Sequence, residues 1–317
     1  MTRTAIGLST GIVLAVLAGQ ASAQVAPVPP SKWGPNDEIG AANYITPARV
    51  VEAAKLVKTG KTYSLGIPVD KNTPAYPPRT CTVYVVQPGQ TGSAAGLGPT
   101  QTTYNDDILN CWVGIGSQLD GLGHIGVGDT YFNGIKWADM TADMTGLKKL
   151  GVEKIPPLVA RGVMLDMAAH MKVDIVPEGT AFNKAEIDAV AKAQNVEIKE
   201  GDIVLFNTGW ISLIGKDNAR YSKAEPGLGK EGAEYLVSKG VVAVGADTWG
   251  LEVIPFEKGS GVFEIHQILL PRSGTYILEN MDTRELAKDK AYEFLFVLGH
   301  SKYTGAVQSM INPIAIR

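Results

Sequence analysis

The chain has few of the residues that most often carry metal or thiol chemistry, with only four histidines and two cysteines among 317 residues. It has no run of basic residues, and its net charge is −3, which excludes the electrostatic footprint of a nucleic-acid-binding protein. Beyond the first residues it has no apolar stretch of about 18 residues that could span a bilayer. We therefore expect a soluble mature protein whose partner is a small-molecule substrate, with no nucleic acid and no membrane involved.

Three common catalytic signatures are also missing. The sequence has no G-x-x-x-x-G-K-[ST] phosphate loop, no strand-linked G-x-G-x-x-G and no G-x-S-x-G nucleophile elbow. Gly121–Asp129 is rich in glycine, but it lacks the strand and the helix that flank a dinucleotide-binding turn. These absences argue against nucleotide chemistry and against a serine nucleophile.

The N-terminus has the features of a secretory signal peptide. Arg3 supplies the positive charge, Ile6–Leu17 the apolar stretch, and Ala21–Ala23 the small-residue cleavage pattern. We predict a signal peptide over residues 1–23, a single domain over residues 24–317, and a periplasmic or secreted protein. The alternative is an uncleaved anchor helix, for which the apolar stretch is short.

Export places the two cysteines in an oxidising compartment, where Cys81 and Cys111 can form a disulfide. The sequence does not give the Cα separation on which a disulfide depends, so two buried thiols are the alternative. We favour the disulfide.

Capping residues and apolar spacing predict an α/β fold with a mixed β-sheet. Helices are expected from Thr46 to Gly60, from Asn183 onwards and over residues 230–239. Compact apolar runs between helices are typical of buried strands, and we predict them at residues 161–167, 201–208 and 240–247. Residues 62–111 have no helical period, which indicates β-structure with long loops.

Four ionisable residues are candidates for chemistry. Asp120 and His124 are four residues apart in a glycine-containing segment, His266 precedes the apolar run QILL, and Glu279 ends the run GTYIL. Imidazoles and carboxylates in apolar surroundings often hold a metal ion, because an unpaired buried charge is costly. A hydrogen-bonded structural cluster is the alternative.

The chain resembles the cyclase family of metal-dependent hydrolases, which includes kynurenine formamidases, isatin hydrolases and trans-dienelactone hydrolases. The resemblance implies a compact α/β fold with a mixed β-sheet, flanking helices and a β-rich N-terminal part. It also implies a homo-oligomer, a dimer or a tetramer. The resemblance rests on six blocks: Trp33–Pro47, His124–Gly134, Arg161–His170, Gly201–Trp210, Pro226–Glu252 and His266–Asp282.

The family motif H-x-G-T-H-x-D-x-P-x-H falls on residues 114–124, GIGSQLDGLGH. Asp120 and His124 match the aspartate and the last histidine of the motif, whereas Gly114 and Gln118 replace its first two histidines. In two-metal members, the missing histidines belong mainly to one of the metals.

The downstream histidine and glutamate of the family correspond to His266 and Glu279. The resemblance therefore implies one divalent ion, Zn²⁺ or Mn²⁺, held by Asp120, His124, His266 and Glu279. The amide oxygen of Gln118 is a further candidate ligand, and a catalytically dead site is the alternative.

The resemblance implies metal-assisted hydrolysis of an amide, formamide or lactone, with His124 or Glu279 as the catalytic proton carrier. The alternative is an inactive periplasmic protein that binds a small molecule on the same fold. Trp33, Trp112 and Tyr131 are candidates for an aromatic face that binds the substrate, and His300 is a candidate substrate contact. We expect Asp247, Trp249 and Glu252 either to shape the pocket or to serve capping and packing.

Overall fold

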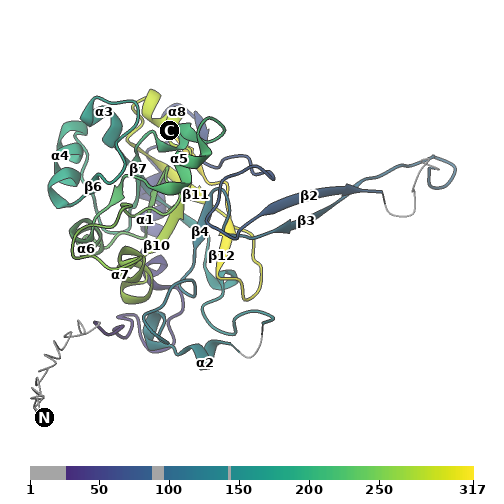
Figure 1. Ribbon diagram of the computed structural model, residues 1–317, viewed down its shortest axis with the longest axis horizontal. Helices are drawn as coiled ribbons and strands as arrows, with labels where there is room; N and C mark the ends of the chain where they lie inside the picture. The colour runs from purple at the N-terminus through teal and green to yellow at the C-terminus, as the bar shows by residue number, and fades with distance from the viewer. Residues whose placement is uncertain (1–25, 88–95, 142–143) are drawn as a thin grey trace, which may run out of the picture.

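The structure, a computed structural model, describes residues 26–87, 96–141 and 144–317. Within them, nine strands form one mixed sheet through the body of the molecule (Figure 1). In spatial order these strands are β1 (Thr62–Ser64), β13 (Ile314–Ile316), β11 (Glu293–Leu298), β5 (Leu158–Asp166), β7 (Ile203–Asn207), β9 (Ala243–Ala246), β10 (Tyr276–Glu279), β4 (Gln118–Asp120) and β12 (Gln308–Met310).

The centre of the sheet is parallel. Strands β5, β7, β9 and β10 run in one direction, and β11 and β4 pair antiparallel with the two outer members of this group. All residues of β7 and β9 are buried, as expected for parallel strands that are covered on both faces. The mixed α/β sheet and the three predicted strands are confirmed as β5, β7 and β9.

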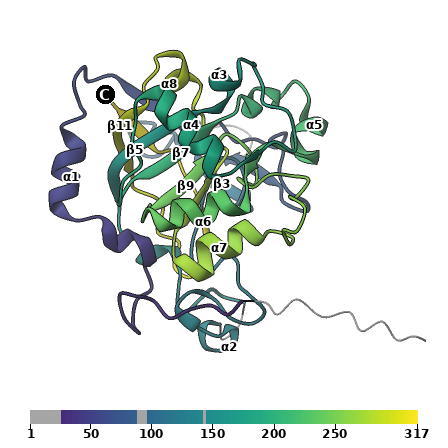
Figure 2. The same ribbon diagram turned by 90° about the vertical axis from the view of Figure 1, so that its left-hand side faces the viewer.

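Helices cover the sheet and fix its strands in place. Figure 2 shows α4, α6 and α7 in front of β5, β7 and β9. The predicted capping box of α4 is present, with Asn183 and Glu186 bonded to each other's backbone, and Ile187 and Val190 are buried on the inner face of the helix. The helices are α1 (Pro47–Ala54), α2 (Trp137–Met140), α3 (Met167–Met171), α4 (Lys184–Gln194), α5 (Asn218–Lys223), α6 (Lys230–Ser238), α7 (Glu264–Ser273) and α8 (Arg284–Lys288).

The first helix is shorter than predicted. It begins at Pro47, with the Thr46 side chain accepting a hydrogen bond from the Arg49 N–H, but it ends at Ala54 instead of Gly60. Ala53 is its one buried residue, whereas Val57 beyond its end is exposed. No apolar face therefore holds residues 55–60 against the body as a helix.

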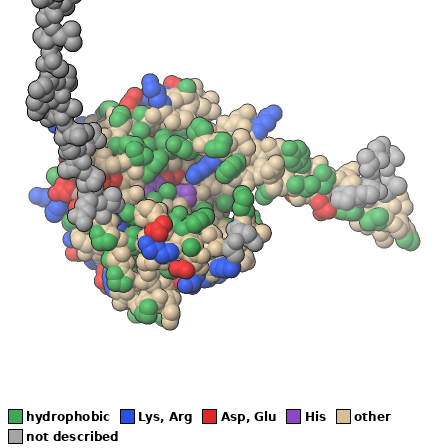
Figure 3. Space-filling model, turned by 60° about the horizontal axis from the view of Figure 1, so that its bottom comes forward, with side chains coloured by type: hydrophobic (Ala, Val, Ile, Leu, Met, Phe, Trp, Pro, Cys, Tyr) green, Lys and Arg blue, Asp and Glu red, His purple; other side chains and the backbone are tan. Residues whose placement is uncertain are grey.

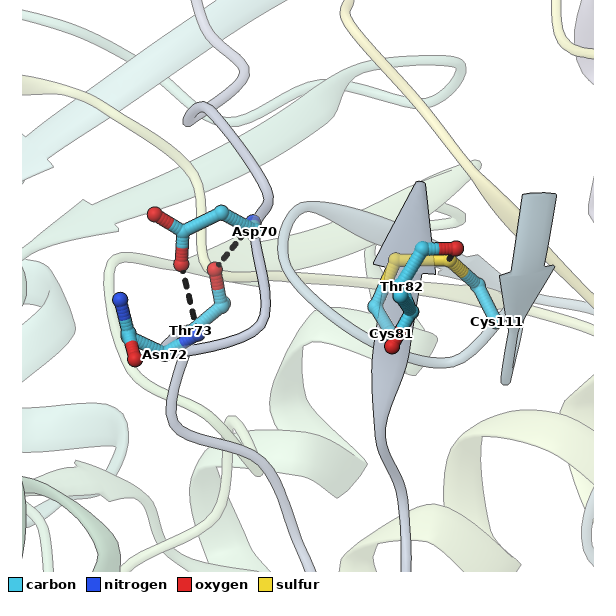
Figure 4. Close-up of a disulfide and its surroundings, with 6 residues drawn as sticks. All are labelled: Asp70, Asn72, Thr73, Cys81, Thr82 and Cys111. Atoms are coloured by element: carbon cyan, nitrogen blue, oxygen red, sulfur yellow. Dashed lines mark hydrogen bonds between the residues drawn. A yellow bond between two sulfur atoms is a disulfide. The ribbon is translucent and has the colours of Figure 1, made fainter. Parts of the chain in front are cut away.

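A two-stranded hairpin, β2 (Cys81–Val86) with β3 (Asp106–Cys111), projects from the body as an arm (Figure 1). Cys81 pairs with Cys111 in the ladder, and a disulfide joins these two residues at the base of the arm (Figure 4). Most side chains of both strands are exposed, including the apolar Val85 and Leu109. A second short pair is formed by β6 (Ala181–Phe182) and β8 (Gly227–Leu228).

In the part of the chain that the structure describes, no helix is long and apolar enough to cross a membrane. The signal peptide predicted over residues 1–23 lies outside the described residues.

The first prediction concerns the sheet. Gly162 of β5 lies opposite Phe294 of β11, and a Cβ added to Gly162 would lie 2.1 Å from the buried Phe294 ring. We expect Gly162→Ala to lower the free energy of unfolding by about 1–3 kcal/mol, because the ring has no space to move into. Urea denaturation measures this. Gly299→Ala is the control, since its Cβ would meet nothing within 4 Å and should change stability by less than about 0.5 kcal/mol. Equal losses in both variants would contradict the packing argument.

The second prediction concerns the arm. An isolated two-stranded hairpin is marginally stable in water, so the disulfide at its base carries much of the arm's local order. We expect the double variant Cys81→Ser/Cys111→Ser to be cleaved by chymotrypsin after Tyr84 and Leu109 at least about tenfold faster than the wild type. Mass spectrometry of reduced digests measures both cuts. Unchanged cleavage rates at both bonds would show that the disulfide does not hold the arm.

Candidate active site

Strand register brings four polar side chains together at one side of the sheet. Strand β4 lies between β10 and β12, and both of these pair with it antiparallel. Gln118 is opposite Glu279 of β10, and Asp120 is opposite Gln308 of β12. Residues two apart in a strand point to the same face, so Gln118 and Asp120 share a face with their cross-strand partners. All four side chains are buried.

Two amide groups hold the carboxylates. Gln118 Nε2 donates to Asp120 Oδ1 at 3.2 Å and to Glu279 Oε2 at 2.6 Å, and Gln308 Nε2 donates to Asp120 Oδ1 at 2.7 Å. A carboxylate accepts hydrogen bonds, so the nitrogen of each amide faces it. Gln118, which the sequence suggested as an oxygen ligand, here presents its amide nitrogen to the two carboxylates.

Gln308 occupies the space beside Gly114, where the family motif has its first histidine. A Cβ on Gly114 would lie 2.4 Å from Gln308 Oε1, so a side chain at position 114 would compete with Gln308 for the same space. Sequence reasoning missed Gln308 because it lies 188 residues from the carboxylate it contacts. Only the β4–β12 pairing reveals it.

His266 stands near the start of α7 and faces the carboxylates. Its Nδ1 lies 2.6 Å from Glu252 Oε1, and its Nε2 lies 3.3 Å from Glu279 Oε1 and 3.8 Å from Asp120 Oδ2. Glu252 is fully buried. The Nδ1–H of His266 therefore donates to Glu252, and its Nε2 is directed towards the site. A carboxylate behind a histidine in this way is the usual support of a metal-binding imidazole.

The Oδ2 atom of Asp120 is buried and has no hydrogen-bond donor among the described residues. His266 Nε2 and His124 Nε2 each lie 3.8 Å from it. Ligand atoms of Asp120, His266 and Glu279 all lie within 4.8 Å of one another. Ligands about 2.1 Å from a tetrahedral Zn²⁺ would be about 3.4 Å apart, so this geometry fits a small divalent cation. His124 is adjacent to that set without belonging to it.

Burial and mutual charge shift the pKa values of three of these groups. Burial raises the pKa of Glu279 to about 7, and the charge of Asp120 adds to this effect. Burial alone would lower the pKa of His266, but hydrogen bonds to Glu252 and Glu279 outweigh it and raise that pKa to about 10. Burial lowers the pKa of His124, and the charges of His266 and Arg79 lower it further, against the opposing charge of Asp120.

A pocket of about 150 Å³ opens onto this cluster. On this face of the molecule, histidine atoms (purple) are visible at the bottom of a hollow between green apolar side chains (Figure 3). His124, His266, Gln118 and Glu279 form the polar side of the pocket. Three aromatic residues, Tyr76, Trp249 and Phe263, also line the pocket and form what we call its aromatic side.

The aromatic side was not identified from the sequence, apart from Trp249, which was expected to shape the pocket or to serve packing. Tyr76 stacks on Trp249 with ring centroids 5.7 Å apart, and Phe263 meets both Tyr76 and His266 edge-on. Tyr76 and Phe263 lie outside the strands and α-helices, so no apolar period marks them.

The four substrate-binding residues expected from the sequence are placed elsewhere. Trp33, Trp112, Tyr131 and His300 are all described, and none lines this pocket. Trp33 packs edge-on against Tyr44 at a separate cavity, Trp112 is exposed at the base of the arm, and Tyr131 packs against Trp137. His300 Nε2 donates to Val152 O. Their role in substrate binding therefore stays a prediction, without support from the lining of this pocket.

Comparison with known proteins agrees with the resemblance seen in the sequence. The model of the Cyclase family, described as "Putative cyclase", matches residues 63–253. A solved structure described as a novel cyclase has 32% sequence identity and a TM-score of 0.82, covering 90% of this chain and 98% of that one. The chain belongs to the cyclase family.

More distant structures share the fold. Isatin hydrolase A from Ralstonia solanacearum has 16% identity and a TM-score of 0.62, covering 86% of this chain and 98% of that one. A predicted metal-dependent hydrolase from Bacillus stearothermophilus has 17% identity and a TM-score of 0.52, covering 81% and 98%. No curated protein matches the chain.

The third prediction concerns Glu252, which contacts His266 from behind the cluster. We expect Glu252→Gln to weaken Zn²⁺ binding by about 10- to 100-fold, because the neutral amide no longer favours the His266 tautomer that directs Nε2 to the site. Competition with a chromophoric chelator measures the affinity. Glu285→Gln on the exposed side of α8 is the control and should bind Zn²⁺ as the wild type does. Unchanged affinity in Glu252→Gln would remove the supporting role of this carboxylate.

Proposed function

We propose that the chain is a metal-dependent hydrolase that opens the C–N bond of an amide or formamide, or the C–O bond of a lactone, in a small ring-containing substrate. The observation that carries this proposal is the buried Asp120 Oδ2, which lacks a donor and lies between two imidazoles and beside Glu279. The printed descriptions of the structural relatives, isatin hydrolase and metal-dependent hydrolase, support the same class of reaction.

Asp120, His266 and Glu279 would hold the cation. In each carboxylate one oxygen is bonded to an amide, and the other is directed at the imidazoles. A bound Zn²⁺ or Mn²⁺ would lower the pKa of water from about 15.7 towards about 7 and polarise the substrate carbonyl. The amides of Gln118 and Gln308 keep the carboxylates in a fixed orientation for this task.

His124 is placed to move the proton. Its imidazole lines the pocket and lies beside Asp120, outside the compact group of three ligand atoms. A neutral imidazole there can take a proton from the attacking water and return it to the leaving nitrogen or oxygen. Of the two roles expected for both residues, catalysis and metal binding, we propose the first for His124 and the second for Glu279.

The pocket selects a small, flat substrate. Its volume of about 150 Å³ is below the about 300–1,000 Å³ of sites for drug-sized ligands. The ring of the substrate would pack against Tyr76, Trp249 and Phe263, and its carbonyl would face the polar side.

Two other expectations stay predictions. Export is expected from the predicted signal peptide, and assembly as a dimer or tetramer is expected from the family resemblance.

The fourth prediction tests this function. We expect the purified protein to hydrolyse at least one member of a panel of isatin-type lactams, N-formyl arylamines and aromatic lactones. Chelation should remove this activity, and Zn²⁺ or Mn²⁺ added separately should restore it. His266→Ala should lower both metal content and turnover by more than about 100-fold. This is a larger loss than the one expected for a residue that only supports a metal ligand. Elemental analysis and initial rates measure the two effects.

His170→Ala is the matched control, since His170 is exposed on α3 and should retain metal and rate. Full activity in His266→Ala, or in chelated protein, would contradict the proposal. Ligand binding by metal-free protein without turnover of any panel member would favour the alternative, an inactive small-molecule-binding protein.

A further inference from the structure

Arg79 brings an unpaired positive charge to the pocket. It lines the cavity together with His124, His266 and Glu279. Within the described residues its guanidinium makes one hydrogen bond, from Nη1 to Gly114 O at 2.7 Å, and it has no carboxylate partner. A guanidinium carries five N–H donors, so most of them are available to a ligand.

Among the described arginines, Arg49, Arg161, Arg220 and Arg284 bond a carboxylate, whereas Arg79, Arg272 and Arg317 do not. Arg161 bonds Asp202 and Glu293, and Arg220 bonds Glu178. These pairs neutralise the guanidinium charge within the protein. Arg79 makes no such ion pair with a described residue, and it lines the pocket.

The fold holds Arg79 in position. Its backbone N–H donates to Tyr76 O at 3.1 Å, so the aromatic ring and the guanidinium belong to the same tight turn. The disulfide between Cys81 and Cys111 follows two residues later, and Gly114, which accepts the Arg79 hydrogen bond, follows three residues after Cys111. The disulfide therefore ties the segment that carries Arg79 to the segment that carries its acceptor, Gly114.

Building on the proposed function, we infer that Arg79 binds a carboxylate that the substrate itself carries, so that the substrate class is small aromatic or cyclic carboxylates. The aromatic side of the pocket accepts the ring, the metal cluster faces the scissile carbonyl, and Arg79 binds the charged group. The planar guanidinium presents paired donors that match a carboxylate. Arg79 is thus a specificity-determining residue, and the reaction that supplies the substrate must leave a ring with both a carboxylate and a hydrolysable C–N or C–O bond.

The test compares benzoate with benzamide, two ligands of nearly the same shape that differ in charge. Calorimetry on the Zn²⁺-loaded protein gives both dissociation constants. We expect the wild type to bind benzoate more tightly, and Arg79→Gln to weaken benzoate by about 10- to 100-fold while benzamide changes by less than about twofold. Arg79→Lys should keep part of the preference, because it retains the charge without the paired donors. Arg220→Gln, which removes a paired surface arginine, should behave as the wild type.

Substrate pairs extend the test to turnover. For 4-formamidobenzoate and its methyl ester, Arg79→Gln should raise KM for the acid by about 10-fold or more and leave the ester unchanged. Equal weakening of both ligands would show that Arg79 only holds Gly114, and an intact preference for benzoate in Arg79→Gln would place the anion elsewhere. Either result overturns the inference, as does a wild type without preference. A benzoate preference that depends on Arg79, in a protein that hydrolyses nothing, would contradict the proposed function and leave the anion site standing.

Discussion

Two carboxylates, Asp120 and Glu279, lie close together inside the protein, and the rest of the site is built around this arrangement. Burying two like charges side by side is unfavourable unless donors or cations compensate them. Gln118 bridges both groups through one amide nitrogen, and Gln308 adds a second donor to Asp120. These bonds use one oxygen of each carboxylate and leave the other directed towards the imidazoles. The free oxygens and the imidazole beside them could therefore hold a cation, which is the physical basis of the proposed metal site.

The supporting residues form a second layer that is also rich in buried acids. Glu252 orients His266, and Glu225 accepts hydrogen bonds from the backbone N–H groups of Trp249 and Gly250. Burial raises the pKa of Glu225 well above its usual range. One buried glutamate thus orients the imidazole of His266, and another holds the loop that carries Trp249 of the aromatic side. The polar and the apolar halves of the site are held by similar means.

The arm and the pocket meet at one short stretch of chain. Tyr76 and Arg79 face the cavity, and the hairpin begins at Cys81 directly after them. The disulfide at the base of the arm therefore stands between an exposed element and the residues that would select the substrate. A chain in an oxidising compartment can use such a link to keep a ligand-binding turn in place without enlarging its core.

The sequence by itself predicted the main strands and the ionisable residues that lie together at the site. Apolar runs between capped helices predicted β5, β7 and β9, because buried parallel strands need continuous apolar sequence. The motif and its downstream partners identified Asp120, His124, His266 and Glu279 as the ionisable residues at the site. The predicted end of α1 at Gly60 was wrong, because residues 55–60 have no apolar face that packs against the body.

Only the tertiary structure decided how these residues are used. It showed that Gln118 presents its nitrogen, that Gln308 shares the space of Gly114, and that the four expected substrate contacts lie away from the pocket. It also brought Tyr76, Phe263 and Arg79 to the cavity. These facts depend on strand register and on contacts between segments up to 188 residues apart. The local sequence pattern indicates which face of a helix or strand is buried. A site depends on which helices and strands become neighbours, and the packing of the whole chain fixes this.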